Sequence, residues 1–206
     1  DGVMVVSGKT MAFAMPGTHG PTEQSYSLLQ SRKDPSRVFI GHSDGVGSMR
    51  WDGQKWIDEG RLPIVYQART FAEDEDGSLW AAGGNGQVVH ATVAASGMRE
   101  SKVEFVGNRE GLPAGPNSVA RALGSVWVGV DRNQNLYRWD RSLRKFVVDN
   151  RAALPIDAPD GSAVLFETDD GSTWTATSSS GTRRIARVYA QFDGNLRIDE
   201  DTYRTL

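Results

Sequence analysis

The three histidines are the residues best suited to acid–base catalysis or metal binding, and they lie far apart in the chain. They are His19, His42 and His90. A metal site needs three or four converging ligands, yet the sequence has no His-x-His or His-x-x-x-His pair and no cysteine. We therefore expect each histidine to be a surface or hydrogen-bonded side chain, and we predict no metal site.

Carboxylates gather in three short segments, at residues 74–76, 169–170 and 199–202. Their polar surroundings indicate turns, so solvated turn charge is the simplest interpretation. A calcium ion held by a rigid acidic loop is the alternative.

One of these acidic segments belongs to a longer motif, ETDDGSTW at residues 167–174. It resembles the Asp-box turn of sialidase-type propellers, with Glu167 in place of the usual serine. The matching residues are Asp169, Gly171, Thr173 and Trp174. Sialidase chemistry also needs an arginine cluster, a tyrosine nucleophile and an acid. Spacing does not select such a set from the residues nearby, which are Arg183, Arg184, Arg187, Tyr189 and Tyr203. We interpret the motif as a turn.

The sequence has no phosphate-binding loop. The glycine-rich segment 83–86 lacks the Lys-Ser/Thr that follows such a loop. We predict no catalytic residue and no cofactor in this chain.

Composition describes a folded domain and excludes two classes of partner. The 206 residues are 38% hydrophobic, which is enough for a sizeable core. Lys and Arg total 23 against 26 acidic residues, so no basic surface for nucleic acid or anionic lipid is expected. No apolar run approaches the length of about 18 residues that a membrane helix needs. The first residues already read like the middle of a folded unit, so we expect a longer parent protein.

The chain is built from a repeated unit of 41 to 47 residues. Aromatic residues open four similar stretches at Phe39, Trp80, Trp127 and Trp174. A Trp-Asp pair follows the first and third of them by twelve residues, at Trp51 and Trp139, and an aromatic residue follows each pair, at Trp56 and Phe146. A Leu-Pro pair separates the units at residues 60–63, 110–113 and 152–155. Three markers in constant order indicate a true repeat.

Each unit contains short apolar runs rich in β-branched and aromatic residues, separated by Gly, Asp and Asn. The second unit has four such runs, at residues 68–73, 78–82, 87–93 and 102–107. Four short strands in a unit of roughly 40 to 50 residues are typical of a propeller blade. We predict an all-β fold of about four and a half blades of four antiparallel strands. The half blade covers residues 1–13, and the full blades cover approximately 25–63, 64–113, 114–155 and 160–206.

A repeated aromatic position in a blade normally lies in the core between neighbouring sheets. We therefore expect Phe39, Trp80, Trp127 and Trp174 to be structural. Trp51, Trp139 and Trp56 fall on later, outer strands, where half exposure is expected.

The ordered motifs resemble the two-component regulator propeller repeat, which builds periplasmic sensor regions of hybrid sensor histidine kinases. The residues that match are Leu112-Pro113, Asp76-Gly77-Ser78-Leu79-Trp80, Gly129, Tyr137-Arg138-Trp139-Asp140 and Phe146. The first unit lacks Asp-Gly before Phe39, the third has LGSVW in its place, and the fourth has no clear Trp-Asp pair. These departures affect where each blade begins and ends, and they do not change the predicted architecture.

The resemblance implies a function in signal transduction. It implies a periplasmic, ligand-sensing region that is not itself catalytic, with histidine kinase activity elsewhere in a membrane-anchored parent. An oligosaccharide or other small ligand and a homodimer formed through the parent are the implied partners. The ligand-binding residues stay unknown at this stage. Two alternatives stay open, namely a propeller glycoside hydrolase, lyase or sialidase-like carbohydrate-binding protein, and a protein-interaction scaffold. The sequence also leaves open whether residues 195–206 pair with residues 1–13 to close a small propeller.

Overall fold

The computed structural model describes residues 3–14, 24–64, 66–83, 86–115, 117–133, 135–149, 151, 162–179, 182–192, 194–199 and 204–205. Within them the chain forms four consecutive antiparallel sheets, each a simple meander. The only helix in the described residues is a 3-10 turn, η1 (Asn108–Glu110). This confirms the predicted all-β fold of four-stranded blades.

The strands follow one another in chain order within each sheet. The first sheet contains β3 (Ser25–Gln30), β4 (Arg37–His42), β5 (Val46–Trp51) and β6 (Trp56–Arg61). The second contains β7 (Thr70–Glu73), β8 (Leu79–Ala82), β9 (Val88–Ala94) and β10 (Gly97–Val106). The third contains β11 (Asn117–Ala122), β12 (Ser125–Val130), β13 (Leu136–Asp140) and β14 (Lys145–Val148). The fourth contains β15 (Ser162–Glu167), β16 (Thr173–Ser179), β17 (Thr182–Ala190) and β18 (Leu196–Ile198), with β19 (Arg204–Thr205) also paired to β17.

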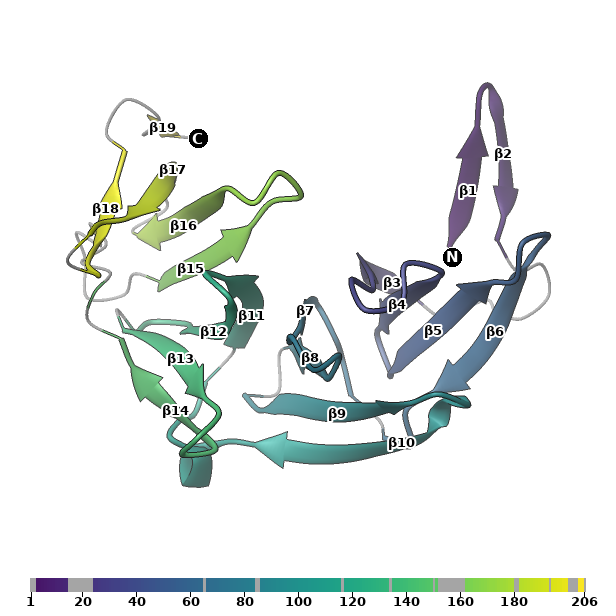
Figure 1. Ribbon diagram of the computed structural model, residues 1–206, viewed down its shortest axis with the longest axis horizontal. Coiled ribbons are helices and arrows are strands. Elements are labelled where there is room, and N and C mark those ends of the chain that lie inside the picture. Colours follow the sequence, from purple (N-terminus) through teal and green to yellow (C-terminus); the bar gives the residue numbers. More distant parts are fainter. Residues whose placement is uncertain are drawn as a thin grey trace.

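The four sheets are arranged side by side around a common centre, as blades of a propeller (Figure 1). The first strand of each sheet is the innermost, and β3 contacts β7, β7 contacts β11 and β11 contacts β15. The chain therefore leaves each blade on its outside and returns to the centre to begin the next. These four inner strands all run in one direction, so their carboxyl ends meet at one end of the centre.

A short hairpin, β1 (Met4–Ser7) and β2 (Thr10–Phe13), forms a separate two-stranded sheet next to the first blade (Figure 1). All eight of its residues are exposed, although Val3 and Ala14 at its base pack against Ile40 and Met49 of the first sheet. Strands β18 and β19 pair with β17 instead of with this hairpin. The C-terminal strands thus complete the fourth sheet.

Asp-Gly turns connect the first and second strands of the second and fourth blades in the same way. Asp76 accepts a hydrogen bond from the amide of Ser78 at 2.8 Å, and Asp170 accepts one from the amide of Ser172 at 2.9 Å. Gly77 has a φ of 85°, which glycine adopts without strain. The Asp-box-like segment is therefore a turn, and the carboxylate that fastens it belongs to Asp170.

The cores lie between neighbouring sheets, where the repeated aromatic residues are placed. Phe39 packs with Leu79 and Val89 of the next sheet, Trp80 packs with Val119 and Val128, and Trp127 packs with Leu165 and Val188. Phe39, Trp80 and Trp127 are at most 1% exposed. Burying an aromatic ring of this size contributes a large apolar area to each contact between blades.

Candidate functional site

The centre of the propeller contains a pocket of about 580 Å³. All four blades contribute to it through the carboxyl ends of their innermost strands and the turns that follow. The lining residues are Leu28 to Arg32 and Pro35 from the first blade, Phe71 to Glu73 from the second, Ala120 and Arg121 from the third, and Phe166 to Asp169 from the fourth. Its volume lies in the range of roughly 300 to 1,000 Å³ that small-molecule sites occupy. We call it the central pocket.

Glu73 positions one wall of the central pocket, and its carboxylate is fully hydrogen-bonded within the protein. Its carboxylate accepts hydrogen bonds from the Ser31 hydroxyl at 2.6 Å and from the main-chain amides of Arg32 and Lys33. Glu73 is 3% exposed, so these three donors replace water around a buried charge. The second blade thereby fixes the turn that carries Arg32 in the first blade.

Two arginines and Glu167 form a charged group in the central pocket. Arg32 donates to Glu167 at 2.9 Å, which links the first and fourth blades. Arg121 approaches Glu167 only to 3.8 Å and Glu75 only to 4.0 Å. Its Nε is buried and has no hydrogen-bond partner among the described residues. Because a buried donor without a partner is costly, Arg121 is available to a ligand that brings an acceptor.

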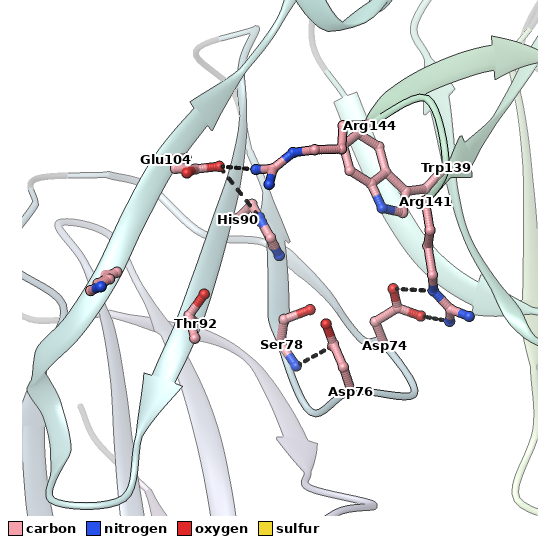
Figure 2. A pocket seen from close by; sticks show the side chains of 10 residues that line it. Asp74, Asp76, Ser78, His90, Thr92, Glu104, Trp139, Arg141 and Arg144 are labelled. Carbon is pink, nitrogen blue, oxygen red and sulfur yellow. Dashed lines mark hydrogen bonds and ion pairs between the residues drawn. The ribbon is translucent and has the colours of Figure 1, made fainter.

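A second pocket of about 380 Å³ lies between the second and third blades, and we call it the interblade pocket (Figure 2). The second blade lines it with residues of the Asp-Gly turn and with His90, Thr92, Lys102 and Glu104. The third blade adds Trp139, Arg141 and Arg144. Two ion pairs cross between the blades there, because Arg141 binds Asp74 and Arg144 binds Glu104 at 3.3 Å.

A cluster of aromatic rings lies beside the interblade pocket. His90 is stacked on Trp80, with ring centres 4.1 Å apart and planes at 20°. Trp139 contacts Trp80 at 4.6 Å and Phe146 at 5.1 Å in tilted arrangements. This cluster holds Trp139 in one orientation at the edge of the pocket.

Burial and the neighbouring carboxylates have opposite effects on the pKa of His90. Burial lowers the pKa of His90, while the carboxylates of Glu104 and Asp76 act in the opposite direction and the net shift is downward. Its Nδ1 lies 3.8 Å from Glu104, too far for a strong hydrogen bond. Burial also opposes ionisation of Asp76, but the neighbouring Ser78 hydroxyl and amide outweigh it and lower the pKa of Asp76.

The repeat positions fall at different depths in the structure. Trp174 is half-buried on β16, whereas Trp51 is 41% exposed and contacts Trp56 at 5.4 Å. Of the six repeat positions, Trp80 and Trp139 are brought into direct contact. Residues 19, 200–203 and 206 lie outside the described residues, so the histidine, acidic residues and tyrosine predicted there are not placed.

The sequence singled out no ligand-binding residue, so the lining of both pockets comes from the structure. Arg32 and Glu167 are separated by 135 residues in the chain, and only the circular arrangement of the blades joins them. Acidic residues 74–76 were recognised as a turn, but no local pattern indicated that β9, β10 and the third blade surround it. Among the described residues, no group of three histidines or carboxylates is placed to hold a metal ion.

These features define the class of the chain as a β-propeller, whose described residues line a central pocket and an interblade pocket. No protein-family model matches the sequence, and no curated protein sequence matches it. Within the described part of the chain, no helix has the length and apolar character required to cross a membrane.

Solved structures share the fold. The extracellular domain of the hybrid two-component system BT4673 from B. thetaiotaomicron superposes with a TM-score of 0.65 at 18% identity, over 96% of this chain and 25% of that one. The corresponding domain of BT3049 from the same organism gives 0.53 at 13%, over 85% and 26%. Virginiamycin B lyase from Staphylococcus aureus gives 0.60 at 14%, over 92% and 58%. The chain thus spans between a quarter and three fifths of these structures, which are extracellular domains of two-component systems and an enzyme.

Proposed function

We propose that this chain is part of the extracytoplasmic, ligand-sensing propeller of a two-component signalling protein, and that a small polar ligand binds in its central pocket. The observation that carries the proposal is the convergence of all four innermost strands on one pocket where the Nε of Arg121 is buried without a partner. The resemblance to the extracellular domains of two hybrid two-component systems supports the sensor role.

The central pocket suits recognition by a receptor. A ligand there contacts several blades at once, so binding changes how the blades press against one another. Arg32 and Arg121 supply donors, while Phe71 and Phe166 supply apolar surface. A ligand with a carboxylate, or with several hydroxyls and one apolar face, matches that combination. The parent protein would carry the kinase, sit in the periplasm and pass the signal on as a dimer.

A thermal-shift screen of the chain against oligosaccharides and small organic acids tests the proposal. A ligand present at about a hundred times its dissociation constant adds about 2.7 kcal/mol to stability. We expect Arg121→Gln to remove most of the shift. Arg109→Gln is the matched control, because Arg109 is exposed on η1 and does not line the central pocket. A shift that persists unchanged in Arg121→Gln contradicts binding at the central pocket.

An enzyme is the second candidate function, favoured by the resemblance to a lyase and by the carboxylates Glu73, Glu167 and Asp169 in the central pocket. Glu73 is held by three donors and Glu167 is ion-paired to Arg32, so contacts within the protein already occupy both carboxylates. Incubation of each ligand with the protein, followed by mass spectrometry, separates the candidates. A receptor returns the ligand intact, and an enzyme returns products.

A further inference from the structure

The interblade pocket holds groups that the contacts between the blades leave unused. Asp74 and Arg141 bind each other, and Asp74 is 6% exposed, so that pair serves to join the blades. Ser78 is different. It is 6% exposed, and its hydroxyl lies close enough to Asp76 to favour the ionised carboxylate, yet it is not in hydrogen-bond geometry with any described group. Figure 2 shows the Ser78 side chain pointing into the space between the Asp-Gly turn and His90. A buried hydroxyl without a partner marks a place where a ligand can bind.

Acceptors lie on both sides of the Ser78 hydroxyl. Asp76 stands beside it on the same turn, and its carboxylate receives one hydrogen bond from the described residues, from the amide of Ser78. Glu104 lies across the pocket on β10, 61% exposed, with a hydrogen bond of 3.3 Å from Arg144 and a distance of 3.8 Å to His90. These two carboxylates and the guanidinium therefore retain hydrogen-bonding capacity toward a ligand.

The balance of charge in the interblade pocket indicates a ligand without net charge. Three carboxylates face three basic side chains, and burial lowers the pKa of the histidine between them. An anion would meet Asp76 and Glu104, and a cation would meet Arg144 and Lys102. The neighbouring carboxylates of Asp76 and Glu104 and the planar guanidinium of Arg144 instead match adjacent hydroxyl groups on one molecule.

The aromatic side of the pocket indicates the shape of such a ligand. Trp139 is partly buried and is fixed by its contacts with Trp80 and Phe146. The face of an indole carries partial negative charge, so it attracts the slightly positive C–H face of a pyranose ring. A volume of about 380 Å³ is at the lower end of the range for small-molecule sites.

We propose that the interblade pocket binds a neutral sugar ring, with its apolar face against Trp139 and its hydroxyls on Asp76, Ser78 and Glu104. Arg144 holds Glu104 in place and donates to a sugar oxygen. This site is separate from the central pocket, so it stands whether or not the proposed sensor function is correct.

A titration followed by NMR tests the proposal on the whole 206-residue chain. The probes are the methyl glycosides of glucose, galactose, mannose and xylose, together with maltose and cellobiose, each at up to about 20 mM, because single sugar rings bind in the millimolar range. The indole N–H signal of Trp139 is assigned as the one that Trp139→Phe removes. We expect at least one probe to shift this signal in a saturable manner.

Two substitutions test the contacts. Asp76→Asn and Glu104→Gln preserve shape and remove a charged acceptor, and each should weaken binding about tenfold. Glu100→Gln is the matched control on the same strand, outside the pocket, and should leave binding unchanged. Arg121→Gln in the central pocket should also leave it unchanged. Equal melting temperatures establish that the variants are folded.

The proposal is overturned by either of two results. The first is that no probe moves the Trp139 signal. The second is that a probe binds with the same affinity to the wild type, Asp76→Asn and Glu104→Gln. If Arg121→Gln then abolishes binding, the sugar occupies the central pocket, which supports the proposed function and refutes this second site.

Discussion

Glu59 joins the strands of the first blade through hydrogen bonds from two arginines and a serine, and its removal gives a measurable prediction. Arg37 on β4 binds it at 2.6 and 2.8 Å, Ser48 on β5 donates to it at 2.6 Å, and Arg50 donates to it at 2.7 Å. The side chains of Arg37 and Glu59 are each 8% exposed. Glu59→Gln therefore leaves a buried guanidinium without its counter-charge.

The expected loss follows from the pKa of Glu59. Burial raises this pKa, but the hydrogen bonds from Arg37, Ser48 and Arg50 outweigh burial and lower it from 4.5 to about 2. That difference corresponds to about 3 kcal/mol of stability for the ionised form. Breaking a buried ion pair costs a similar amount, about 3 to 5 kcal/mol. We expect Glu59→Gln to lower the free energy of unfolding by about 3 kcal/mol at pH 7.

The pH dependence of this loss separates it from a simple packing defect. Because the pKa of Glu59 is lower in the folded state, its contribution is complete above about pH 5 and is lost as the pH falls toward 2. The difference between wild type and Glu59→Gln should therefore shrink over that window. Urea unfolding of both proteins and of Glu100→Gln, an exposed control, at pH 7, 5 and 3.5 measures it. A difference below about 1 kcal/mol at pH 7, or one independent of pH, refutes the reasoning.

Three further substitutions test contacts between the blades and the hydrogen bond of a buried tyrosine. Arg141→Ala should cost about 3 kcal/mol in urea unfolding, because it leaves the buried carboxylate of Asp74 unpaired; a cost below about 0.5 kcal/mol contradicts this. Gly129→Ala should lower the melting temperature by several degrees, since a Cβ there would lie 2.1 Å from the carbonyl oxygen of Ala163 in the fourth blade; an unchanged melting temperature means that the blades separate easily. Tyr66→Phe should cost about 1 to 2 kcal/mol by the same unfolding assay, because the buried hydroxyl donates to a main-chain carbonyl at 2.5 Å, and a neutral effect would show that water replaces it.

The repeat made the fold predictable from the sequence. The four apolar runs of the second unit correspond to β7, β8, β9 and β10, because alternating side chains and Asp-Gly turns act over a few residues. Only β10 begins well before its predicted run, at Gly97. In the third blade, where LGSVW departs from the pattern, Leu123 and Gly124 have φ of 50° and 70° and make a two-residue turn. The hairpin survives the departure because another tight turn replaces the acidic one.

The candidate sites were not predictable in the same way. Arg121 and Glu167 lie in different blades, and their proximity depends on the angle between sheets, which local sequence does not encode. Trp51 and Trp139 occupy the same repeat position, yet Trp51 is 41% exposed and Trp139 packs on the neighbouring blade. Repetition predicts which side chains point between blades, and the neighbouring blade decides which of them are covered.

In the proposed receptor, the ligand binds at Arg121 and is released chemically unchanged. The most direct test is an NMR titration of the strongest ligand from the screen into protein labelled at arginine Nε, recorded over a day so that the ligand signals are followed as well. We predict that the Nε–H signal of Arg121 shifts in a saturable manner while the ligand stays intact. Binding that leaves the Arg121 signal in place, or conversion of the ligand to products, would contradict the receptor account.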